Sequence, residues 1–211
     1  VVKNQLDLLH RIFHTFNSHL YYHGTPIEQL QTLNRAAEFV QQTKELETRF
    51  MNLVKRLKLA FDICSGSESI SETEKDEIHF YLAVRSIIYK LTKGTAPDAS
   101  QMNEKVKTMI QEAIESEGVE EIFKLGEDEA QEIDLFSDDY LAKLDKIKLP
   151  NTKFKLLQKV LKQAIDRMKQ VNKVMGIDFS KRLEAIVQKY NERKEGDVLR
   201  SEVLEDFTNE I

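Results

Sequence analysis

Four of the five histidines fall close together, at His10, His14, His19 and His23. A spacing of four residues places two imidazoles on one face of a helix, where they could share a metal ion. If one continuous helix carries all four, a turn of about 100° per residue points the two pairs in nearly opposite directions. Neither pair has the Glu of an HExxH motif, and catalytic zinc usually needs three protein ligands. We therefore predict half-exposed histidines and no metal site, with a small metal-dependent enzyme as the alternative.

Other motifs with catalytic potential lack the context that their chemistry needs. The sequence DEAQ at 128–131 resembles a helicase box, but a buried strand should precede it and KLGE stands there instead. No GxxxxGK[ST] segment could cradle a nucleotide phosphate. The PD at 97–98 and the ERK at 192–194 resemble parts of a nuclease site, yet both fall on predicted helices, far apart in sequence. Cys64 has no His or Asp at a recognisable spacing. We predict no catalytic residue and no cofactor in this chain.

A strongly basic segment is the most distinctive feature. Residues 152–175 read TKFKLLQKVLKQAIDRMKQVNKVM and contain a single acid, Asp166, although the chain has a net charge of −5. An acid-rich segment, 112–139, with Lys124 as its one base, precedes it. On one helix, five lysines would fall within about 80° of arc, opposite a broad apolar side. These are Lys155, Lys159, Lys162, Lys169 and Lys173.

The five lysines allow three interpretations. An outward charged face is most often simply solvated, but it can also contact phosphates or dock on an acidic protein surface. No aromatic residue stands among the lysines, so we do not expect base stacking, and any DNA contact would be to the backbone. The five lysines are therefore a candidate docking or DNA-backbone face.

The elements that would position these residues are helices. The chain has 211 residues, with only seven glycines and three prolines to interrupt them. Capping boxes at 25–28 (TPIE) and 71–74 (SETE) open two helices, and apolar residues recur at helical spacing from about residue 43 to 64. Further helices are predicted from 97 to 117, at 119–125 and 138–144, from 150 through the basic segment, at 181–194, and from 197 to the end. No segment shows the alternation of a strand.

We therefore predict an all-α fold, a multi-helix bundle of roughly eight helices in two lobes, 1–125 and 126–211, which could pack as one domain. Hinges are expected at 64–71 and 126–137. The single cysteine, Cys64, excludes an internal disulfide and fits a reducing compartment, so we expect a cytoplasmic protein. No apolar run approaches the ~20 residues of a transmembrane helix, and we expect no membrane partner. The chain begins Val1-Val2 without methionine, so we expect a piece of a larger protein.

An ordered series of short segments resembles one known family. The segments are RF at 49–50, RLKLAFD at 56–62, APDA at 96–99, MNEKV at 102–106, IESEGVEEIF at 114–123, DLFSD at 134–138, LPNTK at 149–153, FSKRL at 179–183 and YNER at 190–193. In this order they resemble the C-terminal helical region of the restriction subunit of type I restriction–modification enzymes. The resemblance covers nearly the whole chain and is carried by the order of the segments.

This resemblance implies a parent protein with an endonuclease domain and two motor domains that use ATP and Mg²⁺ to translocate duplex DNA. The helical region would be an assembly element without catalytic residues. Its implied partners are the methyltransferase and specificity subunits and the motor domains of its own chain, and the DNA-backbone-binding module remains the alternative. The nuclease and motor parts are absent from the sequence, which departs from the full family pattern in this respect.

Overall fold

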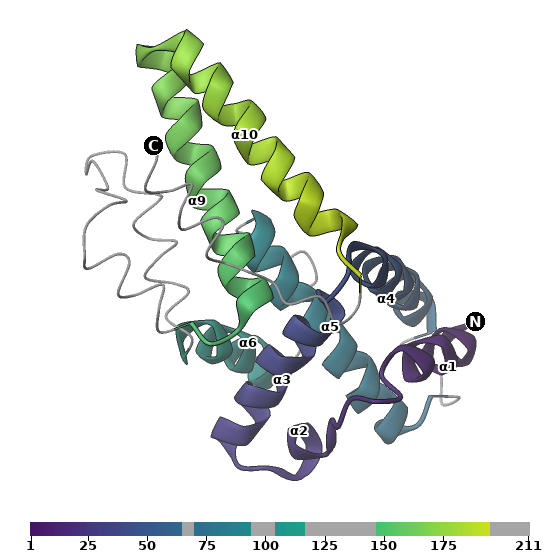
Figure 1. Cartoon of the computed structure of the whole chain (residues 1–211). Helices are drawn as coiled ribbons and strands as arrows, with labels where there is room; N and C mark the ends of the chain where they lie inside the picture. Colours follow the sequence, from purple (N-terminus) through teal and green to yellow (C-terminus); the bar gives the residue numbers. More distant parts are fainter. Residues whose placement is uncertain (65–69, 94–103, 117–146, 195–211) are drawn as a thin grey trace. The chain divides into compact units, whose positions relative to one another are not determined.

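The computed structural model describes residues 1–64, 70–93, 104–116 and 147–194, and these residues form eight helices and no strand (Figure 1). The prediction of an all-α, multi-helix bundle is confirmed. Several expected features lie outside the described residues: the helices at 119–125, 138–144 and 197–211, the hinge at 126–137, and the boundary at 125/126 between the predicted lobes. The chain divides into two compact units, Val1–Ile114 and Glu115–Ile211, and each is described by itself.

Five helices and most of a sixth, α6, build the first unit. Within it, α3 and α4 both pack on α5, α1 lies along α4, and the short α2 lies against α3. The helices are α1 (Val2–Ile12), α2 (His19–His23), α3 (Pro26–Val40), α4 (Lys44–Cys64), α5 (Glu72–Lys93) and α6 (Glu104–Ser116).

Both predicted capping boxes are present and explain where α3 and α5 begin. The Thr25 hydroxyl accepts from the Glu28 backbone N–H, while the Glu28 carboxylate accepts from the Thr25 backbone N–H at 2.8 Å. Ser71 and Glu74 repeat the arrangement at the start of α5. In each box the backbone hydrogen bond is the main reason that the pKa of the glutamate is lowered. Each box satisfies donors that the first helical turn would otherwise leave unpaired.

An aromatic cluster around Phe13 forms the core of the first unit. The Phe13 ring lies 5.5 Å from Phe39 of α3, 5.8 Å from Phe50 of α4 and 5.4 Å from Tyr81 of α5, between ring centroids. Phe13 itself follows the last residue of α1 and is buried. Aromatic pairs at such separations add to the stability gained from burial. One residue thus joins four elements that are distant in sequence.

The second unit contains an antiparallel helical hairpin, formed by α9 (Pro150–Val171) and α10 (Lys173–Glu192) (Figure 1). With 22 residues, α9 is about 33 Å long at 1.5 Å per residue. Pro150 occupies the first turn of α9, as predicted, where its missing N–H is tolerated.

The prediction of one basic helix running through Met175, followed by a helix from residue 181, is wrong. Asn172 separates the two helices with non-helical backbone angles, and its side-chain oxygen accepts from the Met175 backbone N–H at 3.2 Å. Asparagine is among the preferred N-cap residues, so α10 begins at Lys173, eight residues earlier than expected. The four apolar residues around this break are consequently exposed.

Candidate functional site

The α9–α10 hairpin holds the basic residues that the sequence singled out, and its base is closed by a stacked group of side chains. The rings of Phe154 and Tyr190 are parallel, 6° apart in plane, with centroids 3.7 Å apart. The Arg193 guanidinium lies 3.5 Å from the Tyr190 ring centroid. Two groups cannot both fit this close to one face, so Tyr190 lies between Phe154 and Arg193. Stacking of aromatic and guanidinium planes fixes the side chains of three residues against one another.

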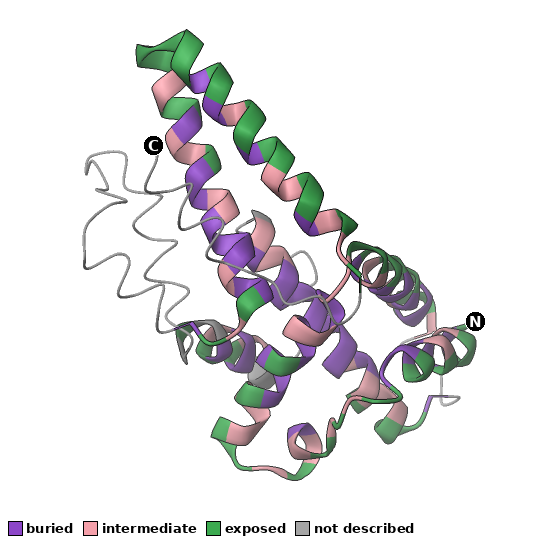
Figure 2. Cartoon of the chain, in the orientation of Figure 1, coloured by how far each residue is buried: buried purple, intermediate pink, exposed green. Residues whose placement is uncertain are grey.

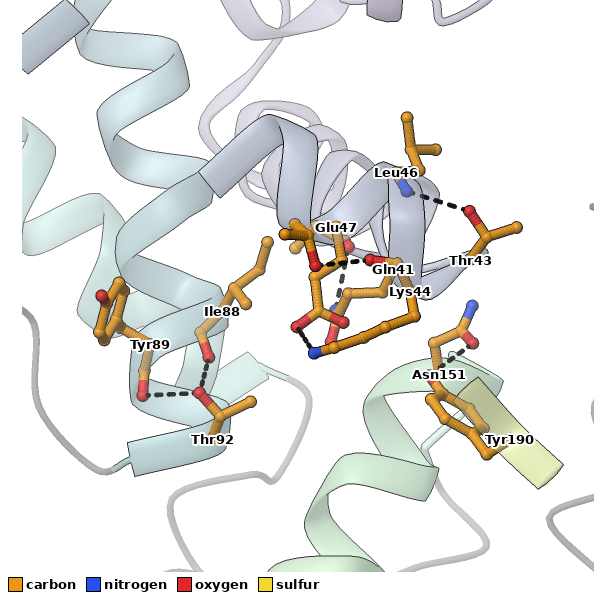
Figure 3. Close-up of polar contacts among 12 residues, drawn as sticks. Gln41, Thr43, Lys44, Leu46, Glu47, Ile88, Tyr89, Thr92, Asn151 and Tyr190 are labelled. Carbon is orange, nitrogen blue, oxygen red and sulfur yellow. Dashed lines mark hydrogen bonds and ion pairs between the residues drawn. The ribbon is translucent and has the colours of Figure 1, made fainter. Parts of the chain in front are cut away.

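Hydrogen bonds complete this closure, which we call the base lock (Asn151, Phe154, Tyr190 and Arg193). The Asn151 side-chain oxygen accepts from the Tyr190 hydroxyl at 3.0 Å (Figure 3) and from Arg193 at 2.8 Å. Arg193 also donates to the backbone carbonyl of Tyr190. Phe154 and Tyr190 are both nearly fully buried. The Tyr190 hydroxyl and the Asn151 side-chain oxygen therefore have partners within the base lock, as burial requires.

At its other end the hairpin turns tightly. Gly176 lies in the first turns of α10, and a Cβ placed on it would come within 2.8 Å of the backbone nitrogen of Lys169 in α9. Real Cβ atoms essentially never approach a neighbour that closely. The absence of a side chain at Gly176 thus permits the two helices to touch directly after the turn.

The five predicted lysines do not form one exposed face. Lys155 is only 8% exposed, and its ammonium lies 5.4 Å from the Tyr190 ring centroid, beside the base lock. Lys173 belongs to α10, not α9. Lys162 is exposed, Lys159 and Lys169 are half-buried, and the expectation of an outward stripe fails at Lys155 because the apolar side of α9 is wider than the spacing suggested.

A groove between α9 and α10 contains two of these lysines. It encloses about 600 Å³, with an apolar floor that includes Ile165 and Leu183. Its rim carries both signs of charge, with Lys162 and Glu184 among the lining residues. Lys169 at the rim donates to Asp166 at 3.3 Å and to Ser180 at 3.2 Å, so its charge is partly neutralised.

The hairpin as a whole is strongly basic. From residue 150 to 192 it has ten lysines and arginines against four aspartates and glutamates, in a chain of net charge −5. Most of these basic side chains are exposed or half-exposed, which suits long-range attraction of an acidic partner or of phosphates.

The histidines are arranged differently from the prediction. Helix α1 ends at Ile12 and a second helix, α2, begins at His19, so the four histidines do not share one helix. His10 contacts Glu77 of α5 at 3.0 Å, and His14 contacts the Arg11 carbonyl at 2.9 Å. The rings of His19 and His23 lie with their centroids 4.6 Å apart and their planes tilted by 41°. Among the described residues, no group of three or more His, Cys, Asp or Glu side chains is placed to hold a metal ion.

We expect the purified protein to retain no zinc after dialysis against a mild chelator. His10 and His14 each already contact a protein oxygen through a ring nitrogen. Even if both were released, the pair would supply only two ligands, fewer than structural or catalytic zinc requires. Elemental analysis by mass spectrometry measures the metal per chain. Stoichiometric zinc that disappears in the double variant His10→Ala, His14→Ala would overturn this expectation.

No helix in the described ranges combines the length and the apolar character needed to cross a membrane.

Comparison with known proteins relates this geometry to a family. The model of the family "Type I restriction enzyme HindI endonuclease subunit-like, C-terminal" matches residues 1–209. The type I restriction enzyme HindI endonuclease subunit of Haemophilus influenzae is 26% identical over 152 residues, which cover 72% of this chain and 14% of that protein. A Methanocaldococcus jannaschii protein, described as a candidate MjaIXP endonuclease subunit of a type I restriction enzyme, is 23% identical over 136 residues, or 64% of this chain and 13% of that protein. No solved structure matches significantly. The chain thus spans about one seventh of the length of these curated relatives.

Proposed function

The chain belongs to the family of C-terminal domains of HindI-like type I restriction endonuclease subunits, and from this membership we propose that it is a non-catalytic assembly domain. In this proposal it docks an ATP-dependent DNA translocase and endonuclease onto the methyltransferase and specificity subunits of a cytoplasmic restriction complex. It needs no cofactor of its own, since ATP and Mg²⁺ would act in the motor and nuclease parts of the parent protein.

The observation that carries the proposal is the basic α9–α10 hairpin, closed at one end by the base lock and at the other by the approach of Gly176 to Lys169. A hairpin fixed at both ends presents its surface in one conformation, which reduces the ordering entropy that binding must overcome. Its charge attracts acidic surfaces at a distance, a feature that raises association rates.

The direct test is binding of this chain to the assembled methyltransferase–specificity complex of its own restriction system. We expect a saturable interaction that requires neither DNA nor ATP, measured by surface plasmon resonance with the complex immobilised. The full-length endonuclease subunit serves as the positive control. If that subunit binds and this chain neither binds nor competes with it, the assembly role is wrong.

The second candidate function, contact with the DNA backbone, rests on the exposed lysines of the hairpin. Reversing their charge tests both this function and docking on protein. We expect the double variant Lys162→Glu, Lys173→Glu to fold normally, because both side chains are exposed. Its affinity for the methyltransferase–specificity complex should fall several-fold, most strongly at low salt, since exposed charges are screened within ~10 Å at 0.1 M. Lys55→Glu with Arg56→Glu on α4 is a matched control, with two exposed bases reversed away from the hairpin.

Salt dependence distinguishes the two functions. Binding to duplex DNA through Z phosphates lowers log affinity by ~0.9Z per unit of log salt, and each lysine lost should reduce that slope by about one. Docking on protein shows a shallower slope and needs no DNA. If the double variant matches the wild-type protein in both assays at every salt concentration, these two lysines are only part of a solvated surface.

A further inference from the structure

The turn of the α9–α10 hairpin carries an exposed apolar patch that neither helix covers. Val171 is 91% exposed, Val174 81%, Met175 47% and Ile177 40%. These four residues lie within seven positions of the sequence, and they make up half of the large hydrophobic residues exposed in the described part of the chain. The end of the hairpin where they lie is almost wholly exposed (Figure 2). Scattered exposed hydrophobic residues are ordinary, whereas four of them within seven positions of one turn indicate an interaction surface.

The patch is held in a defined shape. Asn172 ends α9 and caps α10 through the Met175 backbone N–H, and its own backbone N–H donates to the Met168 carbonyl at 2.7 Å. The contact between Gly176 and Lys169 fixes the second helix directly against the first. The four apolar side chains therefore project from a rigid corner and need little ordering when they bind.

Basic residues surround the patch. Within residues 166 to 182 the surrounding charges are Arg167, Lys169, Lys173, Lys181 and Arg182 against Asp166 and Asp178. Both acids are engaged by neighbours, Asp178 with Arg182 at 3.1 Å and Asp166 with Lys169 at 3.3 Å. The remaining bases, Arg167, Lys173 and Lys181, are exposed and leave an excess of positive charge around an apolar centre.

We propose that the hairpin tip (Val171, Val174, Met175 and Ile177) inserts into an apolar pocket bordered by carboxylates on a protein partner. An apolar centre with a charged rim is the usual anatomy of a protein–protein interface. Because the residues around the tip are positively charged, we expect acidic residues around the pocket of the partner. Proteins with a positively charged surface would be repelled by the tip. A lipid surface would also accept apolar and basic residues, but the tip has no tryptophan or tyrosine, and amphipathic membrane helices bury a whole helix face and not a turn.

This inference rests on the proposed assembly role and names the surface that performs it. The test uses the full-length endonuclease subunit with Val171→Ser and Val174→Ser, and measures its Kd for the methyltransferase–specificity complex. Because the two side chains are exposed, the variant should fold with unchanged thermal stability. Loss of two valines from a buried interface should raise Kd by about tenfold to a hundredfold.

The chain offers a matched control. Leu59 and Ile63, 56% and 85% exposed on α4, form another pair of exposed apolar residues, and Leu59→Ser with Ile63→Ser should leave Kd unchanged. An unchanged Kd in the tip variant would overturn the inference and leave the assembly role intact, provided that the wild-type protein binds. If the full-length wild-type subunit binds and this chain alone neither binds nor competes with it, the assembly role itself is refuted.

Two other outcomes would also overturn the inference. Sedimentation of the wild-type protein, but not the tip variant, with anionic phosphatidylserine vesicles would assign the tip to a membrane. Concentration-dependent self-association in analytical ultracentrifugation, lost in the tip variant, would assign it to a second copy of this chain.

Discussion

Replacing Tyr190 with alanine is expected to destabilise the α9–α10 hairpin by about 3–5 kcal/mol, the range for deleting a large aromatic side chain from a packed site. The residue is 5% exposed and lies between Phe154 and Arg193, so its removal leaves a cavity between α9 and α10. It also removes one hydrogen bond to Asn151. Hydrogen exchange of the α9 and α10 amides measures this directly, because local opening of the hairpin can be read separately from the first unit.

One conservative variant and one control show which part of the Tyr190 side chain stabilises the hairpin. Tyr190→Phe keeps the ring stack and loses only the hydroxyl, and since Asn151 still accepts from Arg193, the expected loss is about 1 kcal/mol. Lys189→Ala, at the exposed neighbouring position, should change hairpin exchange very little. Equal protection of the hairpin in wild type and Tyr190→Ala would show that the base lock does not hold the helices together.

The same variant links stability to the proposed function. If the hairpin docks as a fixed unit, Tyr190→Ala should weaken assembly even though Tyr190 is buried and cannot touch a partner. The loss should be partly recovered at lower temperature or with a stabilising osmolyte, which restores the packed state. A direct contact residue, such as Val174, would show no such recovery.

Much of the fold could be predicted from local signals. The boxes at Thr25–Glu28 and Ser71–Glu74 fix where α3 and α5 begin, because a cap is a short-range interaction whose partners are three residues apart. The apolar residues from Phe50 to Phe61 predicted α4 in the same way. Both features depend only on neighbours along the chain, and the structure confirms them.

The candidate site was harder to predict because its important features depend on a single break and on packing. Apolar and basic residues continue at helical spacing across Asn172, so the periodicity predicted one helix through Met175 where the structure has two. The preference of asparagine for N-cap positions was the available signal. The burial of Lys155 and the stack of Phe154 on Tyr190 require knowing that residues 36 positions apart meet across a hairpin, which no local pattern reveals.

The close approach of α10 to α9 at Gly176 leads to the second large expected effect on hairpin stability. Gly176→Leu should destabilise the hairpin by about 1–3 kcal/mol, because a side chain there collides with the backbone of α9 and overpacks the contact. The first atom alone would lie 2.8 Å from the Lys169 nitrogen and 2.9 Å from its Cα. These are backbone atoms, so the collision can be relieved only by moving one helix away from the other.

Gly176→Ala tests which of two opposing effects on hairpin stability is larger, the helix propensity of alanine or the collision of its Cβ with α9. Alanine favours a helix interior over glycine by about 1 kcal/mol, so propensity alone predicts a more stable hairpin. The Cβ collision opposes this, and we expect it to win, giving a net loss measured by faster amide exchange in α9 and α10.

The control for this pair is Ala185→Gly, at an exposed position of α10, where only propensity changes and exchange should quicken by the equivalent of about 1 kcal/mol. If Gly176→Ala stabilises the hairpin by the amount that Ala185→Gly destabilises it, then the helices separate freely at the turn. The tip would then not be rigidly presented. If Gly176→Ala destabilises the hairpin and also weakens binding of the exposed tip to its partner, the close contact of α9 with α10 sets the geometry in which Val171 and Val174 are offered.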